Sequence, residues 1–570
     1  MSHSKRLRYL FMGLVALAAL AGLAACGGGE KEKTPAATTA GATATAAAGE
    51  RAQGGEITVA SFEFASLDPH FSSFAQDISL QRMLWRGLYT LDGDNNPQPS
   101  MAASLPTISA DGKTYTIKLR SGLKWSDGQP LTAKDFELGI KRTCNPVIAG
   151  EYEYVLDASI VGCADHYKNE GGFSQALEDA VGVKAIDDTT LEIKLNQAQP
   201  TFTIILSLWM TFPVPKHLIP NTSDPWPTDP AKLAYNGPYI LTSYTPKSEV
   251  TLAPNPNWAA PNGIKPTLDK ITIKFIDDLA QANRAFETGE LDFANVDRTQ
   301  LQAIAAKFPK EYVKALKPST RGLEMNLAKP PLDKLDVRLA LSQAIDRVKL
   351  NEVVAGGGNE PTTTWLPAVT GGPPPDAFEK EIGFNPESAK KHLADAGYPN
   401  GQGFPELTIL TGDSPAAKKT GEFLVEQFKQ ILGITVKQEV VDAKTRSQRF
   451  TDEQFELFPG GWIQDYPDPE NWIVGLFDTP GTLNNYNCSD PEIDNLIDKA
   501  RFNTNDAQRL QQYADANKLI STRICGIAPY WHENDHFLIK EKVVGLRENI
   551  AGQDAAIAGD WIAEAWGLRK

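Results

Sequence analysis

Strand-like and helix-like patterns alternate along almost the whole of this chain, and this alternation limits the fold classes open to it. Short runs in which every second residue is apolar indicate strands, and apolar residues spaced three or four apart indicate helices. Strands are expected at residues 56–60, 113–120, 191–195, 271–275, 407–410 and 434–441, and helices at 78–88, 279–288, 337–352, 386–396, 416–432, 492–502 and 506–523. Interleaving of this kind predicts a mixed α/β fold.

The expected globular body runs from Gly55 to Lys570, and no second long apolar segment interrupts it. A body of this size exceeds what one hydrophobic core usually serves, so two or three lobes are expected, with a ligand between them. The formal net charge is −15, from 56 basic and 71 acidic residues spread along the chain. This balance disfavours nucleic acid as a partner, because binding it requires a concentrated basic face.

The first 25 residues have the order of an export signal. Lys5, Arg6 and Arg8 precede an uncharged stretch, which ends in Leu-Ala-Ala before Cys26. The stretch is short for a spanning helix, which needs ~20 apolar residues. Leu-Ala-Ala-Cys resembles the lipobox of bacterial lipoproteins, so residues 1–25 are expected to be a signal peptide and Cys26 the lipidated residue. An ordinary secretory signal with an accidental cysteine is the alternative.

Residues 26–54 are expected to be a disordered linker behind this anchor. They are rich in Gly, Ala, Thr and charged residues and almost free of large apolar side chains. Such a segment cannot bury enough surface to offset its ordering entropy. As a flexible coil it would span ~30 Å, a length that suits a tether.

Four further cysteines remain after Cys26: Cys144, Cys163, Cys488 and Cys525. An even number in an exported chain indicates two disulfides, for which three connectivities exist. Proximity in the sequence favours Cys144–Cys163 and Cys488–Cys525. No Cys-x-x-Cys is present, so neither a zinc knuckle nor a redox motif is expected.

One segment carries the zinc-protease pattern H-E-x-x-H, formed by His532, Glu533 and His536. That chemistry needs a helix, which places both histidines on one face. Asn534 and Asp535 are poor helix formers, so a surface loop leading into a strand is expected instead, with no metal site. A surface metallopeptidase is the less favoured alternative, and no catalytic residues are assigned.

Seven segments, taken in order, resemble the extracytoplasmic solute-binding proteins of peptide-type ABC importers, solute-binding family 5. They cover most of residues 55–550. They are LDPH (67–70), KTYTIKLRSGLKWSDGQPLTAKDF (113–136), NGPY (236–239), NPNW (255–258), MNLAKPPLDKLDVRLALSQAIDR (325–347), AKKHLADAGYPNGQGFPELTI (389–409) and GGWIQDYPDPENW (460–472).

The resemblance implies an α/β, periplasmic-binding-protein-like fold of type II, cluster C. Three lobes are implied, with a ligand cleft between lobes I and III that closes by a hinge motion. Lobe I would comprise residues 55–93, 214–322 and 536–570, lobe II residues 94–213, and lobe III residues 323–535.

The implied function is that of a substrate-binding lipoprotein of an ABC importer. It would be a monomer on the extracytoplasmic face of the cell membrane, facing the periplasmic space. It would capture di- or oligopeptides and deliver them to permease subunits whose cytoplasmic ATPases supply the energy. No cofactor is expected, and a nickel complex or an oligosaccharide is the alternative ligand.

The resemblance also implies site residues. Asp465 stands where relatives place the aspartate that pairs with the α-ammonium of the peptide; the alternative is a loop carboxylate that caps a turn. The peptide backbone would pair in extended form with segments near Trp462 and near residues 74–77. The expected ligand-binding residues are Trp462, Asp465, Tyr466, Gln76, Asp77, Asn485 and Tyr486, with Asp468, Asn471 and Asn484 in second rank.

Overall fold

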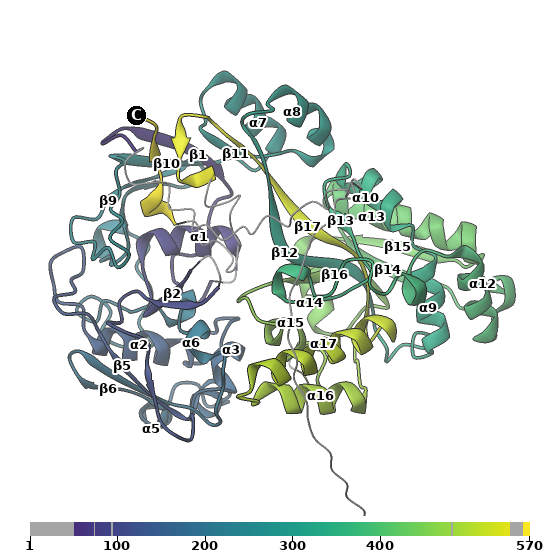
Figure 1. The fold of residues 1–570 in the computed structure, drawn as a ribbon, viewed down its shortest axis with the longest axis horizontal. Coiled ribbons are helices and arrows are strands. Elements are labelled where there is room, and N and C mark those ends of the chain that lie inside the picture. Colours follow the sequence, from purple (N-terminus) through teal and green to yellow (C-terminus); the bar gives the residue numbers. More distant parts are fainter. Residues whose placement is uncertain (1–50, 73, 93–94, 480, 482, 548–561) are drawn as a thin grey trace, which may run out of the picture. The chain divides into compact units, whose positions relative to one another are not determined.

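The fold is built around a sheet of eleven strands in the order β15-β14-β16-β12-β17-β11-β1-β10-β9-β8, with β13 paired to β17 (Figure 1). A computed structural model describes residues 51–570 except 73, 93–94, 480, 482 and 548–561. The strands are β1 (Glu56–Ser61), β8 (Tyr239–Thr245), β9 (Glu249–Pro254), β10 (Lys270–Phe275), β11 (Phe293–Asn295), β12 (Tyr312–Met325), β13 (Glu360–Pro361), β14 (Leu407–Gly412), β15 (Val436–Val441), β16 (Leu457–Ile463) and β17 (Ile527–Ile539).

Two long antiparallel strands, β12 and β17, cross the centre of this sheet. β17 pairs with β11 and β12, and β12 pairs in turn with β16, so the two strands link the β1 side of the sheet to the β14 side. Their register shifts between Leu316 and Thr320 and again between Arg321 and Gly322. The boundaries expected between lobes I and III, at 322/323 and 535/536, fall inside these strands. The segments assigned to the two lobes therefore share continuous strands.

A separate sheet of four strands has the order β4-β5-β7-β6, and all of it lies within residues 94–213. Its strands are β4 (Thr107–Ile108), β5 (Thr114–Lys118), β6 (Val183–Asp187) and β7 (Thr190–Lys194). Alternate residues such as Ile117 and Ile193 are fully buried, as expected for a sheet with one covered face. Two small ladders join β2 (Tyr89–Leu91) to β3 (Pro97–Pro99), and β18 (Val543–Val544) to β19 (Gly567–Leu568).

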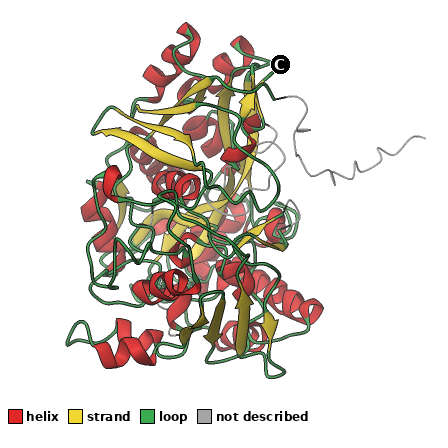
Figure 2. Ribbon diagram, turned by 90° about the vertical axis from the view of Figure 1, so that its left-hand side faces the viewer, coloured by secondary structure: helices red, strands yellow, loops and turns green. Residues whose placement is uncertain are grey.

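Helices are interspersed with the strands throughout the described body (Figure 2). They are α1 (Ala75–Leu84), α2 (Ala133–Thr143), α3 (Tyr154–Asp157), α4 (Cys163–Tyr167), α5 (Gln175–Ala180), α6 (Phe202–Ile205), α7 (Leu279–Thr288), α8 (Leu301–Lys307), α9 (Leu335–Gln343), α10 (Arg347–Ala355), α11 (Glu379–Ile382), α12 (Pro386–Asp395), α13 (Pro415–Gln427), α14 (Ala443–Thr451), α15 (Glu470–Ile473), α16 (Pro491–Arg501) and α17 (Asp506–Thr522). Among the described helices, none combines the length and apolar character that crossing a bilayer requires. The mixed α/β class is confirmed, and most elements lie within a few residues of their expected positions.

The single helix expected at 337–352 is wrong, because the structure divides it into α9 and α10. Asp346 caps α10 by accepting a hydrogen bond from the amide of Lys349 at 2.9 Å, a typical N-cap contact. The Ser342 carbonyl, which a continuous helix would pair with the Asp346 amide, instead accepts from Arg347 Nη1 at 3.2 Å. Val348, which a continuous helix was expected to place on one apolar stripe with Leu341 and Ile345, is 59% exposed.

The end of the expected linker also needs correction, because the ordered body already includes Arg51. Arg51 is buried, and its Nη1 donates to the carbonyl of Glu564 at 2.7 Å. It also forms an isolated bridge with Arg569. A residue from a polar stretch is thus held by the C-terminal segment, a long-range partner that local composition does not reveal. Cys26 lies outside the described residues.

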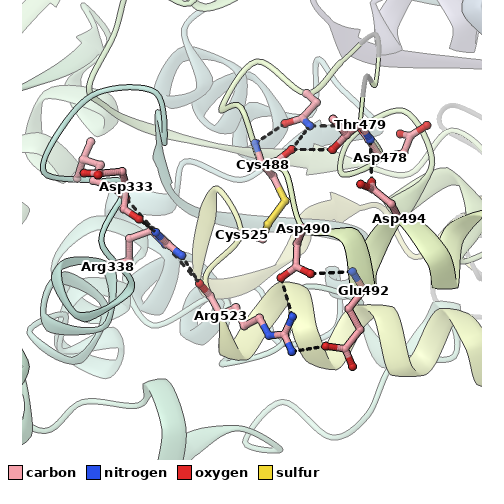
Figure 3. The surroundings of a disulfide bond; sticks show 12 residues. Asp333, Arg338, Asp478, Thr479, Cys488, Asp490, Glu492, Asp494, Arg523 and Cys525 are labelled. Atoms are coloured by element: carbon pink, nitrogen blue, oxygen red, sulfur yellow. Dashed lines mark hydrogen bonds and ion pairs between the residues drawn. A yellow bond between two sulfur atoms is a disulfide. The ribbon is translucent and has the colours of Figure 1, made fainter.

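The structure joins Cys144 to Cys163 and Cys488 to Cys525, the pairing that the sequence favours. The second disulfide lies between the loop before α16 and the end of α17 (Figure 3). Beside it, Arg523 forms ion pairs with Asp490 at 2.6 Å and Glu492 at 2.5 Å. These bonds hold Cys488 and the start of α16 against the end of α17.

We expect the double substitution Cys488→Ser/Cys525→Ser to lower the free energy of unfolding by about 4 kcal/mol, from the chain entropy of the loop it closes. The two cysteines are 37 residues apart. Urea denaturation of the oxidised protein and the variant measures the difference. The free energies of unfolding of the wild type and the variant are also compared with both proteins under reducing conditions. Equal stability of the variant and the oxidised wild type would contradict this role of the disulfide.

Candidate functional site

The carboxylate of Asp465 is buried just after β16 and, within the described part of the chain, is bonded only to neutral groups. Asp465 is 3% exposed. Its Oδ1 accepts from the Tyr152 hydroxyl, and its Oδ2 accepts from the Tyr154 hydroxyl and from Asn471 Nδ2, all at 2.9 Å. Burial raises the pKa of Asp465, and these three hydrogen bonds oppose the rise.

The turn next to Asp465 is capped by other side chains. Asn471 Oδ1 accepts from the amide of Asp465 at 2.8 Å, and Asp468 Oδ1 accepts from the amide of Glu470 at 2.9 Å. Among the described residues, no backbone amide donates to the carboxylate of Asp465. Asp468 is also locked in a bidentate ion pair with Arg509, with both contacts at 2.8 Å. The turn-capping alternative thus describes Asp468, whereas the side chain of Asp465 is held by Asn471 of the same turn and by two tyrosines distant in sequence.

Tyr152 and Tyr154 are site residues that sequence reasoning missed. The ring of Tyr152 packs edge-on against Trp209 at 4.7 Å, and Trp209 Nε1 donates to the carbonyl of Ser72 at 3.0 Å. This chain of contacts joins the 66–72 turn, the 209–211 segment and the 152–154 segment to Asp465. Separations of more than 300 residues between the tyrosines and Asp465 left no local signal of this pairing.

Trp462 and Tyr466 lie on either side of Asp465 in the chain, and their contact with a ligand stays a prediction. Trp462 is half-buried on β16, and its Nε1 donates to Asn471 Oδ1 at 3.2 Å. Tyr466 is 6% exposed. Asn471, a second-rank candidate, therefore contacts both Trp462 and Asp465.

Asp77 and Gln76 lie in the first turn of α1. Both carboxylate oxygens of Asp77 accept backbone amides, from Ala65 and Ser66, at 2.9 Å each. Burial raises the pKa of Asp77. Because the chain is helical from Ala75 onward, residues 75–77 offer no free strand edge, and the expectation that they pair with an extended ligand is wrong. Gln76 lies beside Phe62 and Phe64 at a small cavity of 20 Å³, and its role in ligand binding stays a prediction.

Tyr486 is a packing residue rather than an open pocket wall. It is 2% exposed, its ring lies 5.4 Å from that of Phe477, and Gly526 directly faces it. A side chain on Gly526 would collide with the Tyr486 ring at 2.2 Å. Asn484 bonds the backbone of Cys488, which fixes the same loop. Asn485 is half-buried beside them, and its contact with a ligand stays a prediction.

A cavity of 220 Å³, here called the α16 cavity, lies directly beside the Asp465 cluster. Tyr154 and Asn471, which both bond the Asp465 carboxylate, are part of its wall. On one side it is lined by α3, α4 and Gln199, and on the other by β16, α15, the 474–483 loop and Arg501. Its lining includes Asp157, Lys168, Trp462, Tyr466, Glu470, Asp478, Leu483 and Arg501.

A second cavity of 660 Å³, here called the arginine cavity, lies at the other end of β16. β14 and β16 pair only at Ile409 and Leu457. Beyond that point Thr411 and Gly412 of β14 and Pro459 of β16 line the cavity. Its remaining wall includes Asp278, Leu279, Asp297, Arg298, Arg321, Arg446, Ala417, Tyr530, Trp531 and Glu533.

Charge in the arginine cavity is organised around Glu533. Glu533 Oε2 accepts from Ser319 at 2.7 Å and from Arg321 at 3.1 Å, and Arg298 lies 3.6 Å from Oε1. Burial would raise the pKa of Glu533, but the nearby cations Arg321, Lys317 and Arg298 hold it well below its usual range. Arg446 donates to the carbonyl of Pro459 at 2.6 Å. The cavity therefore presents arginine donors beside the free edge of β16.

Comparison with known proteins places this architecture in a family. Residues 96–484 match the family described as bacterial extracellular solute-binding proteins, family 5 Middle. The chain belongs to this family. The resemblance found in the sequence is thereby confirmed.

Individual relatives of this family 5 protein cover most of both chains. The periplasmic oligopeptide-binding protein OppA of Escherichia coli K12 is 29% identical over 494 residues, which are 85% of this chain and 88% of the relative. The probable deoxycholate-binding periplasmic protein YgiS of the same strain is 29% identical over 467 residues, 81% and 85% of the two chains. The solved structure of the Escherichia coli murein tripeptide binding protein MppA aligns with a TM-score of 0.76, at 26% identity, over 91% of this chain and 99% of that one. The fold class is confirmed. The names of these relatives differ in the ligand that each protein is said to bind.

The H-E-x-x-H segment of this family 5 protein lies within β17, and the surface loop expected there is wrong. His532 and His536 are buried on the strand, 5% and 4% exposed. Residues four apart on a strand are separated by ~13 Å, and the intervening odd position points to the other face. His532 contacts Thr320 and Thr362, whereas His536 contacts Tyr312. Two histidines so placed do not share one metal ion, and no group of metal-ligating side chains gathers among the described residues.

Glu470 connects the α16 cavity to the segment that precedes α6. Its Oε1 accepts from Gln199 Nε2 at 3.0 Å, and its Oε2 accepts from the Thr201 hydroxyl at 2.6 Å. Burial, assisted by the neighbouring carboxylate of Asp468, raises the pKa of Glu470 to about 7. A carboxyl whose pKa is raised in the folded state favours folding most when it is protonated.

The free energy of unfolding should therefore decline as the pH rises from about 4.5 to about 7, because Glu470 then loses its proton more readily in the unfolded state than in the folded state. Glu470→Gln keeps a neutral group in place and removes this titration. We expect the Tm of the variant, relative to wild type, to rise across that range and to level off above it. Thermal melts from pH 4.5 to 8 check this, with Glu422→Gln on the exposed side of α13 as the control. A difference in Tm that does not change with pH would refute the role of Glu470.

Proposed function

We propose that this protein binds peptides outside the cytoplasmic membrane and delivers them to the permease of an ABC importer. The observation that carries the proposal is a buried carboxylate, Asp465, which has three neutral donors and, among the residues that the structure describes, no cationic partner. A buried charge without an opposite charge is costly. The α-ammonium of a peptide supplies that opposite charge. The names of the OppA and MppA relatives support peptide as the ligand class.

The peptide backbone would lie along β16. This strand pairs with β12 on one edge, and its other edge pairs with β14 only at Leu457. The remaining edge, from Pro459 to Ile463, is free of strand partners among the described residues, and an extended peptide can add to such an edge. With its ammonium at Asp465, the peptide would run antiparallel to β16 toward the arginine cavity. At ~3.4 Å per residue, this edge accommodates about five peptide residues.

The tyrosines of the 152–154 segment fit a site that closes over its ligand. In the arrangement described here they donate to both oxygens of Asp465 and so keep the carboxylate hydrogen-bonded. A carboxylate offers about four acceptor positions, and three are occupied. Entry of the ammonium would use the remaining position or replace a hydroxyl, with opening at the strands β12 and β17 admitting the peptide.

Asp465→Asn is expected to weaken the binding of a free-amine peptide such as Ala-Ala-Ala-Ala by ~2–5 kcal/mol, because the ammonium loses its charged partner. Titration calorimetry measures this change. The N-acetylated peptide has no ammonium, so the same substitution should change its affinity little. Asp395→Asn, at the exposed end of α12, is the control. Equal affinity of wild type and D465N for the free-amine peptide would remove Asp465 from the site.

The anchor is a separate part of the proposal. The basic head, the apolar run and Leu-Ala-Ala-Cys at Cys26 support lipidation and attachment to the outer face of the cell membrane. The family consists of substrate-binding proteins, and we assign no catalytic step to this chain. The substrate-binding body would act as a monomer on the tether of residues 27–50.

Cys26→Ala should abolish attachment of lipid and move the protein from the membrane fraction to the soluble fraction of the cell. Metabolic labelling with a tritiated fatty acid, followed by fractionation of the expressing bacterium, measures both effects. Cys144→Ala/Cys163→Ala, which keeps Cys26, is the control and should stay labelled. Labelling of the Cys26 variant at the wild-type level would show that the cysteine is not the anchor.

A further inference from the structure

The α16 cavity opens directly beside the carboxylate that we propose binds the peptide ammonium. Tyr154 and Asn471 each bond Asp465 and also line the cavity. A side chain on the first residue of a bound peptide is therefore within reach of this space. The chemistry of the cavity wall then decides which first residues the site prefers.

The carboxylates that line the cavity all have donors. Asp157 is paired with Lys168 at 2.8 Å, and Asp478 Oδ1 accepts from the amide of Gly475 at 2.6 Å. Glu470 accepts from Gln199 and Thr201, as described above. Each of these three carboxylates thus has at least one donor within the protein, and Lys168 is paired with Asp157.

Arg501 differs from these groups. It is the last residue of α16, half-buried, and it lines the cavity. Its guanidinium lies 5.4 Å from the ring of Phe502, but among the described residues it makes no hydrogen bond or ion pair. A guanidinium offers five donors in a planar fork that matches a carboxylate. Among the described residues that line the cavity, Arg501 is thus a cation whose hydrogen-bonding capacity is unused.

We propose that the α16 cavity binds a carboxylate against Arg501. The inference rests on the proposed peptide function and refines it to peptides that carry a carboxylate close to their α-ammonium. Two sources have this chemistry: the side chain of an N-terminal Glu or Asp, and the C-terminal carboxylate of a dipeptide whose backbone leaves the β16 edge and turns into the α16 cavity. Mutual attraction with Glu470 and Asp478 keeps the guanidinium at the cavity without a direct bond to either.

Titration calorimetry on the full-length protein tests this with amidated tetrapeptides that differ only in their first residue. Glu-Ala-Ala-Ala-amide should bind about 10-fold or more tightly than Gln-Ala-Ala-Ala-amide, as expected for a hydrogen bond between charged groups. In Arg501→Gln this ratio should fall to about one, with the affinity for the Gln peptide unchanged. Lys499→Gln, an exposed change in the same helical turn, should keep the ratio.

Dipeptides distinguish the two sources of the carboxylate. If the C-terminus provides it, Ala-Ala should bind more tightly than Ala-Ala-amide, and Arg501→Gln should remove that difference. A preference for Lys-Ala-Ala-Ala-amide over both other tetrapeptides would overturn the inference, because the cavity would then select a cation. Equal binding of the Glu and Gln peptides, together with equal binding of the two dipeptides, would overturn it while leaving peptide binding intact. Failure of every free-amine peptide to bind would instead reject the proposed function itself.

Discussion

A carboxylate removed from water has to be supplied with hydrogen-bond donors, and at Asp465 this requirement draws distant parts of the chain together. The donors come from the 152–154 segment and from Asn471, which also accepts the Asp465 amide. Each donor is neutral, so the carboxylate is solvated by the protein without being neutralised. The cost of burying the charge is reduced but not cancelled. The α-ammonium that we propose binds at Asp465 would supply the missing opposite charge.

The strand pair β12–β17 gives that carboxylate its surroundings. β16 pairs with β12, so the position of Trp462 and of the turn that carries Asp465 follows from the register of that ladder. The same ladder aligns Arg321 with Gly461, which directs the arginine toward Glu533 and the arginine cavity. The two ends of β16 thus acquire opposite character, with a carboxylate at one end and arginines at the other. This polarity matches an extended peptide that has a free ammonium and a free carboxylate.

Much of the fold could be predicted from the sequence because the apolar spacing and the caps agree with each other. Leu279–Thr288 illustrates this: Asp278 caps the first turn, Gly289 ends the last one, and the observed helix has the expected bounds. The 337–352 segment shows the limit of the method. Its apolar spacing continues through Ile345, but Asp346 and Arg347 divert the backbone groups that a continuous helix needs.

The site was less predictable, for a physical reason. The motif around Asp465 could be recognised, yet its partners Tyr152 and Tyr154 depend on contacts between segments that no local pattern records. For Asp77 the difficulty was different. The sequence predicted a ligand-binding residue, whereas in the structure its carboxylate accepts hydrogen bonds from two backbone amides of a neighbouring turn. A carboxylate that binds ligand and one that holds a turn look alike in sequence. Only their donors distinguish them.

The groups that donate hydrogen bonds also distinguish the acidic residues around the α16 cavity from one another. Asp468 is bound bidentately by Arg509, which fixes the turn after Asp465, and Glu470 is bonded to Gln199 and Thr201. Asp468 thus has a cationic partner, whereas Glu470, like Asp465, has only neutral donors among the described residues. These three acidic residues within six positions therefore differ in their partners: a guanidinium for Asp468, the 199–201 segment for Glu470, and two tyrosine hydroxyls and Asn471 for Asp465. Leu483 of the cavity wall precedes Cys488, which the disulfide with Cys525 joins to the end of α17, so we expect loss of this disulfide to loosen that side of the cavity.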